Sequence, residues 1–207
     1  LSMISRLIEQ LRAGGANHQL LLSASTDCAR AHLTQVKKNN PLEPPALCML
    51  MRKHLLGARV ISVTQAESDR ILEIALEHTD ELGDRARKRI VCEIMGKHSN
   101  IIFLSEDGRI LDSARRVNEL ISSVREVLPG LRYERPPAHG KIPFDRADEA
   151  SLAAALEGKS GALQKLLAQI VSGLSAQTAR EIAFRVAGNE DARLEDVGLP
   201  AAAAGAA

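Results

Sequence analysis

The sequence predicts an α+β fold in which an antiparallel β-sheet or sandwich packs against helices and a small helical unit follows. Three observations support this prediction. A long apolar helix pattern lies near residues 46–56, five segments between residues 59 and 114 have apolar residues with a period of two, and helical spacing returns after Ser151. With 207 residues and 45% apolar content, the chain is long enough for one sizeable core, or for one core plus a small helical appendage.

The first 36 residues carry mixed signals. Leu1–Arg12 has apolar residues at helical spacing and is followed by Gly14-Gly15, so periodicity alone predicts an amphipathic helix there. Leu20–Leu22 and Ala31–Val36 are short apolar or alternating runs, and a polar turn at Thr26-Asp27 separates them. This pattern predicts two strands.

A helix is predicted from Ala46 to Leu56. Pro44-Pro45 stands before it and Gly57 directly follows it, which is the asymmetry expected of helix ends. The middle of this segment is almost continuously apolar. We therefore expect the helix to be buried.

Beyond Gly57 the period of two predicts an antiparallel meander, separated by turns at Asp80–Asp84, Gly96–Ser99 and Glu106–Gly108. The five predicted strands are Arg59–Gln65, Arg70–Leu76, Lys88–Met95, Asn100–Leu104 and Arg109–Ala114.

The remainder is predicted to be a linker, a helical unit and a tail. Leu128–Gly130 and Pro136–Pro143 carry turn chemistry, and helical patterns follow at Leu152–Leu156, Ala162–Val171 and Ala176–Ala187. Ser175 is a suitable N-cap for the last of these helices. We expect an α+β domain at 1–145, a helical region at 146–188 and a flexible tail at 189–207, because the alanine-rich end offers nothing to pack.

Composition limits the kinds of nucleic-acid site that the chain can carry. Lys plus Arg is 27 and Asp plus Glu is 26, so the net charge of +1 gives no global attraction for polyanions, and any such site must be a local patch. The chain has only four aromatic residues and no Trp, so a reader of unpaired bases is disfavoured. Contact with folded RNA through phosphates and shape remains open.

The potential metal ligands and nucleophiles do not form a recognisable constellation. Cys28, Cys48 and Cys92 are widely spaced among apolar neighbours, which predicts buried, reduced thiols in a cytoplasmic protein. The histidines and cysteines lack the close paired spacing of a zinc site. We expect no bound metal, no cofactor and no enzymatic activity. No apolar run approaches the ~20 residues needed to span a bilayer.

Several sequence blocks stand out together: Pro44–Leu55, Asp69–Ile71, Glu93–Ile102, Val127–Gly130, Tyr133 and Pro136-Pro137. These blocks resemble one known family, the NFACT N-terminal family, which is also called the fibronectin-binding protein A family. They occur in the family's order, and the resemblance covers roughly Leu20–Ala187.

The resemblance implies a fold related to the N-terminal domain of formamidopyrimidine-type DNA glycosylases, followed by a helix-hairpin-helix region. It also implies a strand at Leu7–Arg12, which we favour over the helix. The hairpin departs from the family pattern because Ser175 stands where a second glycine is usual, which weakens the expectation that its amides hold a phosphate. The coiled coil and the second NFACT domain expected downstream do not lie within this sequence.

The family resemblance also implies partners and a function. Such proteins bind large ribosomal subunits that carry peptidyl-tRNA and recruit alanyl-tRNA, so that alanine is added to stalled chains. We therefore expect a tRNA- and large-subunit-binding module of a ribosome quality-control factor. Two alternatives are an adhesin that binds fibronectin or fibrinogen, as the family's older name suggests, and a glycosylase-like nucleic-acid-binding domain.

Asp69-Arg70 is the principal candidate site. In the family an Asp-Arg pair engages tRNA, and it corresponds to Asp69-Arg70 here; from the residues alone, an ordinary solvated pair at a strand end is favoured. Alternation along the strand would place Arg70 on the side of Leu72 and Asp69 on the other side.

Three further residues are candidate RNA-facing groups: Lys97 and His98, at a turn where Asn100 can cap by side-chain hydrogen bonds, and Arg52. Arg52 lies at a helix C-terminus, where cations are favoured whatever the function. The basic run at Arg85–Arg89 is interpreted as a solvated hairpin beside an acidic turn.

Overall fold

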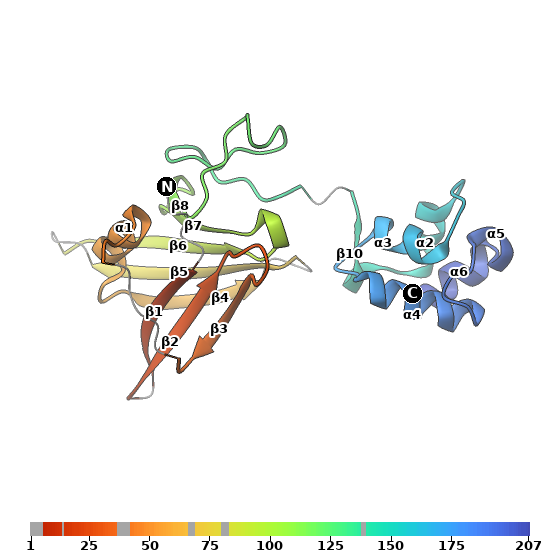
Figure 1. Cartoon of the computed structure of the whole chain (residues 1–207), viewed down its shortest axis with the longest axis horizontal. Helices are drawn as coiled ribbons and strands as arrows, with labels where there is room; N and C mark the ends of the chain where they lie inside the picture. The colour runs from red at the N-terminus through yellow and green to blue at the C-terminus, as the bar shows by residue number, and fades with distance from the viewer. Residues whose placement is uncertain (1–5, 14, 37–41, 66–68, 80–82, 138–139) are drawn as a thin grey trace. The chain divides into compact units, whose positions relative to one another are not determined.

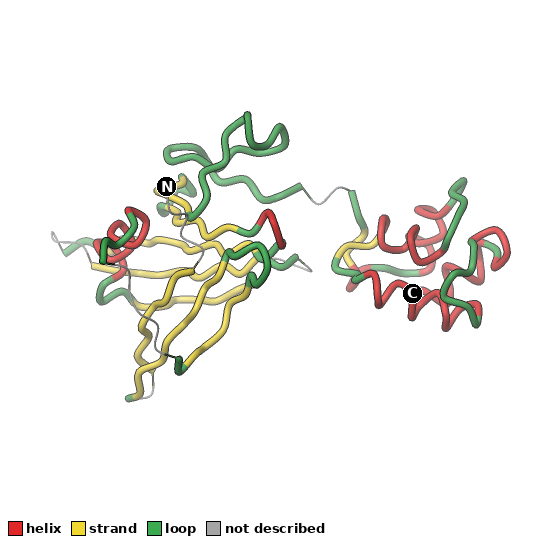
Figure 2. The backbone as a smooth tube through the Cα atoms, in the orientation of Figure 1, coloured by secondary structure: helices red, strands yellow, loops and turns green. Residues whose placement is uncertain are grey.

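The protein is described by a computed structural model that divides the chain into two compact units (Figure 1). The first comprises residues 1–66 and 70–135, and the second comprises residues 136–207 together with 67–69. Residues described are 6–13, 15–36, 42–65, 69–79, 83–137 and 140–207. The first unit consists mainly of strands and the second mainly of helices (Figure 2).

A three-stranded antiparallel sheet begins the first unit, in the order β1 (Arg6–Ala13), β2 (Ala16–Ser23), β3 (Arg30–Thr34). The strand favoured at Leu7–Arg12 is confirmed, and the helix that periodicity alone predicts there is wrong; residues 1–5 lie outside the described part. The physical reason is pairing. β1 matches β2 over its whole length, from Arg6 opposite Ser23 to Ala13 opposite Ala16, so its backbone groups bond to a neighbouring strand.

A five-stranded antiparallel meander forms the main sheet. All five predicted strands are present, with ends that differ by a few residues. They pair in chain order: β4 (Arg59–Gln65), β5 (Ile71–Thr79), β6 (Arg85–Glu93), β7 (Asn100–Leu104) and β8 (Ile110–Ser113).

One face of this sheet packs on helix α1 (Ala46–Leu55) and on β2. Ile74, Ile90 and Phe103 point to this side and form a core with Leu47 and Met51 of the helix and with neighbouring residues. The helix is therefore predicted correctly, and the expected burial holds for one stripe of it. Leu47 and Met51 are buried, whereas Met49 is 51% exposed.

Within the described residues, the opposite face is covered by a second core at one end. Ile71, Val91 and Ile102 form a second core there with Val127 of the long segment that follows β8. That segment closes through a bridge between Val117 and Val127. The other end of this face carries charged residues.

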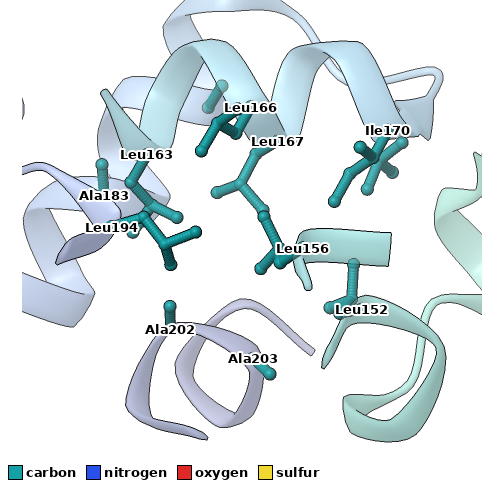
Figure 3. Close-up of a cluster of buried hydrophobic side chains, with 12 residues drawn as sticks. Leu152, Leu156, Leu163, Leu166, Leu167, Ile170, Ala183, Leu194, Ala202 and Ala203 are labelled. Carbon is teal, nitrogen blue, oxygen red and sulfur yellow. The ribbon is translucent and has the colours of Figure 1, made fainter. Parts of the chain in front are cut away.

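The second unit contains α2 (Glu149–Leu156), α3 (Leu163–Ile170), α4 (Ala176–Ala187), α5 (Leu194–Val197) and α6 (Leu199–Ala206). Leucines of α2 and α3 meet in its centre (Figure 3). Ser175 caps α4 as predicted, since its hydroxyl accepts from the Thr178 amide at 3.0 Å. Two short strands not predicted from the sequence, β9 (Ile142–Pro143) and β10 (Val171–Ser172), pair in parallel within the expected linker and hairpin.

The expectation of a flexible tail with nothing to pack is wrong. Ala202 and Ala203 of α6 are fully buried and lie against α2 and α4 (Figure 3). Alanine is the best helix former and loses no side-chain entropy, so a run of alanines makes a thin helix that approaches its neighbours closely. A Cβ at Gly205 would lie 2.7 Å from Cγ2 of Val186 in α4.

The three cysteines are free thiols, but their settings differ from the predicted uniform burial. Cys92 is buried in the sheet, and burial followed by the charge of Glu93 raises the pKa of its thiol to about 12. Cys28 is exposed, because it lies in the turn between β2 and β3, where Arg30 donates to its carbonyl at 2.9 Å. Among the described residues, no helix is long and apolar enough to cross a membrane.

Candidate RNA-binding site

The candidate site lies at one end of the five-stranded sheet. Ile71 opens β5 opposite Glu93, the last residue of β6, and the Ile94 amide donates to the Arg70 carbonyl at 2.8 Å. Arg70 is thus held beside the connection from β6 to β7, with its side chain exposed. Asp69 precedes it, is half-buried and interacts with a partner. Both residues lie before β5 begins, so the expected strand alternation does not assign their faces.

The connection from β6 to β7 contains a short 3₁₀ helix, η1 (Gly96–His98), with Lys97 and His98 exposed. The predicted turn is present. Its cap is Ser99, whose hydroxyl accepts from the Met95 amide at 2.8 Å, and not Asn100 as predicted.

Asn100 instead joins this turn to the residues after β8. Its side-chain amide donates to the Arg115 carbonyl at 2.8 Å, and its Oδ1 accepts from the Arg115 amide at 2.9 Å. The Arg115 guanidinium then donates to the Lys97 carbonyl at 2.7 Å. Four cationic or titratable side chains, Arg70, Lys97, His98 and Arg115, therefore gather at this end of the sheet. We call them the cationic corner.

Arg52 is not part of this group. It is exposed near the end of α1, two residues before His54, whose ring centroid lies 6.0 Å from that of His78 and 6.1 Å from that of Phe103. His78 follows Arg70 by eight residues, which is on the order of 25 Å along a strand. The structure thus brings Arg70, Lys97 and His98 together and leaves Arg52 elsewhere.

A buried ion pair between Arg125 and Glu93, the last residue of β6, lies next to the cationic corner. The Arg125 guanidinium donates to both carboxylate oxygens of Glu93, each at 2.7 Å, and the Glu93 side chain is 0% exposed. The Tyr133 hydroxyl donates to the same carboxylate at 2.9 Å. These contacts fix the segment after β8 against the strand that ends beside Arg70.

The electrostatics of this ion pair follow from burial. Burial disfavours the charge of Arg125, but the hydrogen bonds and charge of Glu93 outweigh it and raise the pKa of the guanidinium. Burial and then the charge of Glu93 also raise the pKa of the Tyr133 phenol, so Tyr133 remains a donor. We therefore assign the group a structural role.

Sequence reasoning missed Arg115 and the Glu93–Arg125–Tyr133 group. The partners of Glu93 lie 32 and 40 residues away in the chain, so no local spacing marks them. Among the described residues, no cluster of three or more His, Cys, Asp or Glu side chains is arranged to hold a metal ion.

Comparison with known proteins places the chain in a family. The model of the NFACT N-terminal and middle domains matches residues 5–202. A Bacillus subtilis protein named Rqc2 homolog RqcH is 38% identical over 180 residues, which are 86% of this chain and 32% of the relative. The protein of the same name from Streptococcus suis is 37% identical over 179 residues, again 32% of its length. The chain therefore spans about a third of these relatives.

Solved structures give the same result. The N-terminal part of the fibronectin/fibrinogen-binding protein of Streptococcus suis has a TM-score of 0.75 and 34% identity, covering 87% of this chain and 68% of that one. The N-terminal domain of the fibronectin-binding protein PavA of Streptococcus pneumoniae has a TM-score of 0.75 and 36% identity, covering 86% of this chain and 67% of that one. These matches agree with the predicted α+β architecture, and the chain belongs to the NFACT N-terminal domain family.

Proposed function

We propose that this chain is the tRNA- and large-ribosomal-subunit-binding module of a cytoplasmic ribosome quality-control factor that promotes alanine tailing of stalled nascent chains. It acts by binding, without enzymatic chemistry of its own. The relatives named Rqc2 homolog RqcH support the proposal at the level of the family.

The cationic corner is the structural observation that supports RNA binding by particular residues. Arg70, Lys97 and His98 are exposed at one sheet end, on a chain whose net charge is only +1. Local cations of this kind suit phosphate oxygens and base edges of a folded RNA. Asp69 would accept from a hydroxyl or orient a neighbouring cation.

Binding of tRNA over a salt series tests this assignment. Arg70→Ala and Lys97→Ala should each reduce the slope of log affinity against log salt by roughly one, because each removes one phosphate contact. Asp69→Ala should weaken binding without a comparable change of slope. Arg185→Ala, which removes an exposed arginine from α4, is the control and should change little. Unchanged affinity in an Asp69→Ala, Arg70→Ala double variant would contradict the site.

An adhesin remains the second candidate, because two solved relatives are named for binding fibronectin or fibrinogen. Binding of the full-length protein to immobilised fibronectin and fibrinogen, and its recovery with large ribosomal subunits from lysate, separate the two. Co-purification with large subunits that Arg70→Ala abolishes supports the proposal. Matrix-protein binding with no recovery of RNA would favour the adhesin.

A further inference from the structure

Five arginines gather around two glutamates on the charged end of the sheet face described above. Three of them surround Glu77: Arg59 of β4 at 3.2 Å, Arg85 of β6 at 3.8 Å and Arg87 of β6 at 3.7 Å. A single carboxylate on β5 thus lies among three guanidinium groups from the strands on both sides, β4 and β6.

The second glutamate repeats this arrangement. Glu73 lies on the same face of β5, four residues before Glu77, and pairs with Arg89 at 3.4 Å and with Arg135 at 3.0 Å. We call Arg59, Arg85, Arg87, Arg89 and Arg135 the arginine face.

Exposure is divided unequally between the two charges. The glutamate side chains are only 12–14% exposed, whereas those of the arginines are 38–76% exposed. The carboxylates therefore lie beneath the guanidinium groups, and five cations above two anions leave an excess of three positive charges. Because the guanidinium groups are solvated and salt screens their attraction to the carboxylates, the arginines remain available to another anion.

Strand alternation divides the basic run that is interpreted from the sequence as a solvated hairpin. Within the basic run Arg85–Arg89, Lys88 pairs opposite Leu76 and points to the face that α1 covers. Arg85, Arg87 and Arg89 lie on the other face at intervals of about 6.7 Å. The glutamates of β5 lie one strand away, at about 4.8 Å, and Arg59 of β4 lies one strand further, at about twice that distance. The run is thus one row of a two-dimensional cationic surface and not only a solvated hairpin.

We propose that the arginine face binds the phosphate backbone of double-stranded RNA without reading its sequence, as a second contact surface apart from the cationic corner. This proposal rests on the proposed function, since it takes RNA as the partner. Arginine forms charge-assisted, often bidentate bonds with phosphate. Among the described residues, the strand positions that carry the arginine face hold no aromatic side chain, and the Tyr133 hydroxyl of the same unit donates to Glu93. Stacking of unpaired bases is therefore not its mode of binding, whereas a row of backbone phosphates matches a row of arginines.

The test measures binding of a 20-base-pair RNA duplex of arbitrary sequence, by fluorescence anisotropy over a salt series. Replacing Arg85 and Arg87 together with Gln should lower the affinity at least about tenfold at 0.1 M salt and reduce the salt slope by about two. Glu77→Gln should increase the affinity, because it removes the carboxylate that opposes three guanidinium groups.

The matched control is Arg185→Gln with Arg193→Gln, which removes the same charge from two exposed ion pairs of the helical unit. Duplex binding that is unchanged in the Arg85, Arg87 variant, or lowered equally in the control, overturns the inference. Urea unfolding of each variant verifies that the fold is kept.

A tRNA titration of the same proteins separates the two proposals. Wild-type tRNA binding that Arg70→Ala weakens, together with duplex binding that the Arg85, Arg87 variant leaves unchanged, overturns the arginine face and leaves the proposed function in place. Duplex binding that depends on Arg85 and Arg87, with no wild-type binding to tRNA or large subunits, overturns the proposed function alone.

Discussion

Glu93 is an acidic residue whose side chain is fully buried, and its neighbours determine how far this burial destabilises the fold. Removing a carboxylate from water is unfavourable by several kcal/mol unless its oxygens are paired and hydrogen-bonded. Here both oxygens accept from Arg125, and one also accepts from Tyr133. The Arg125 guanidinium donates in addition to the Glu134 carbonyl at 2.7 Å, so the group ties a long segment without regular structure to the sheet.

Removal of one partner of Glu93 should therefore strongly destabilise the fold. Arg125→Ala leaves Glu93 buried without its cation, and we expect a loss of about 3–5 kcal/mol in the free energy of unfolding. Urea denaturation measures this loss. Arg185→Ala, which breaks an exposed pair of the same 2.7 Å length, should cost no more than about 0.5 kcal/mol. Similar losses in the two variants would contradict a special role for the buried pair.

His54 predicts a dependence of stability on pH. Burial, and then the charges of Lys88, Lys53 and His78, lower its pKa below the ordinary 6.5. The unfolded chain therefore takes up a proton before the folded one does. The contribution of His54 to stability is present above about pH 6.5 and is lost as pH falls from there through the lower folded-state pKa.

The measurement is the urea midpoint between pH 7.5 and pH 5, for wild type and for His54→Gln. The variant should lose less stability than wild type over this interval. His98→Gln is a suitable control, because His98 is exposed on η1, far along the sheet from α1. Parallel pH profiles for wild type and His54→Gln would show that another group governs the change.

At the same scale, the sequence carried enough information to nominate Arg70, Lys97 and His98, because they lie in short blocks that match a family. It could not nominate Arg115, whose place in the cationic corner depends on the bonds of Asn100 across two strands. It also grouped Arg52 with them, although the end of α1 lies over another part of the sheet.

Elements were predictable where local pattern and tertiary context agree. The five strands of the main sheet have apolar residues with a period of two in the sequence, and they pair in chain order as an antiparallel meander. Local pattern alone predicts β1 and the final helix wrongly, and the reasons are opposite. Pairing with β2 overrides helical spacing in β1, whereas burial of Ala202 and Ala203 gives packing to a segment whose composition resembles a linker.

The N-cap of α4 is a prediction at the scale of one element. Ser175 accepts from the Thr178 amide, and Ser175→Ala should destabilise the helical unit by about 1 kcal/mol, because that amide loses its partner. Ser175→Gly, which restores the residue usual in related hairpins, should cost only a few tenths of a kcal/mol, and Ser175→Asp should keep most of the stability. Thermal unfolding followed by circular dichroism at 222 nm ranks the three, and equal effects of Ala and Asp would argue against capping.

For the whole molecule, the cores of the two units share no residue among those described. One core of the first unit lies around Phe103 and another around Ile102, and the core of the second unit lies around Leu167. Cooperative unfolding follows from a shared core, so we expect two transitions where a single-domain chain would show one.

The chain offers a separate probe for each unit, and this makes the expectation testable. It contains no Trp and one Tyr, Tyr133, which lies in the first unit, so tyrosine fluorescence reports on that unit alone. Helical circular dichroism reports mainly on the second unit, because α1 is the one α-helix described in the first.

Leu167→Ala, at a fully buried position, should cost about 2–5 kcal/mol and move the circular-dichroism transition to lower urea, with the fluorescence midpoint unchanged. Ile102→Ala should do the reverse. Movement of both transitions in either variant would mean that the two units unfold as one.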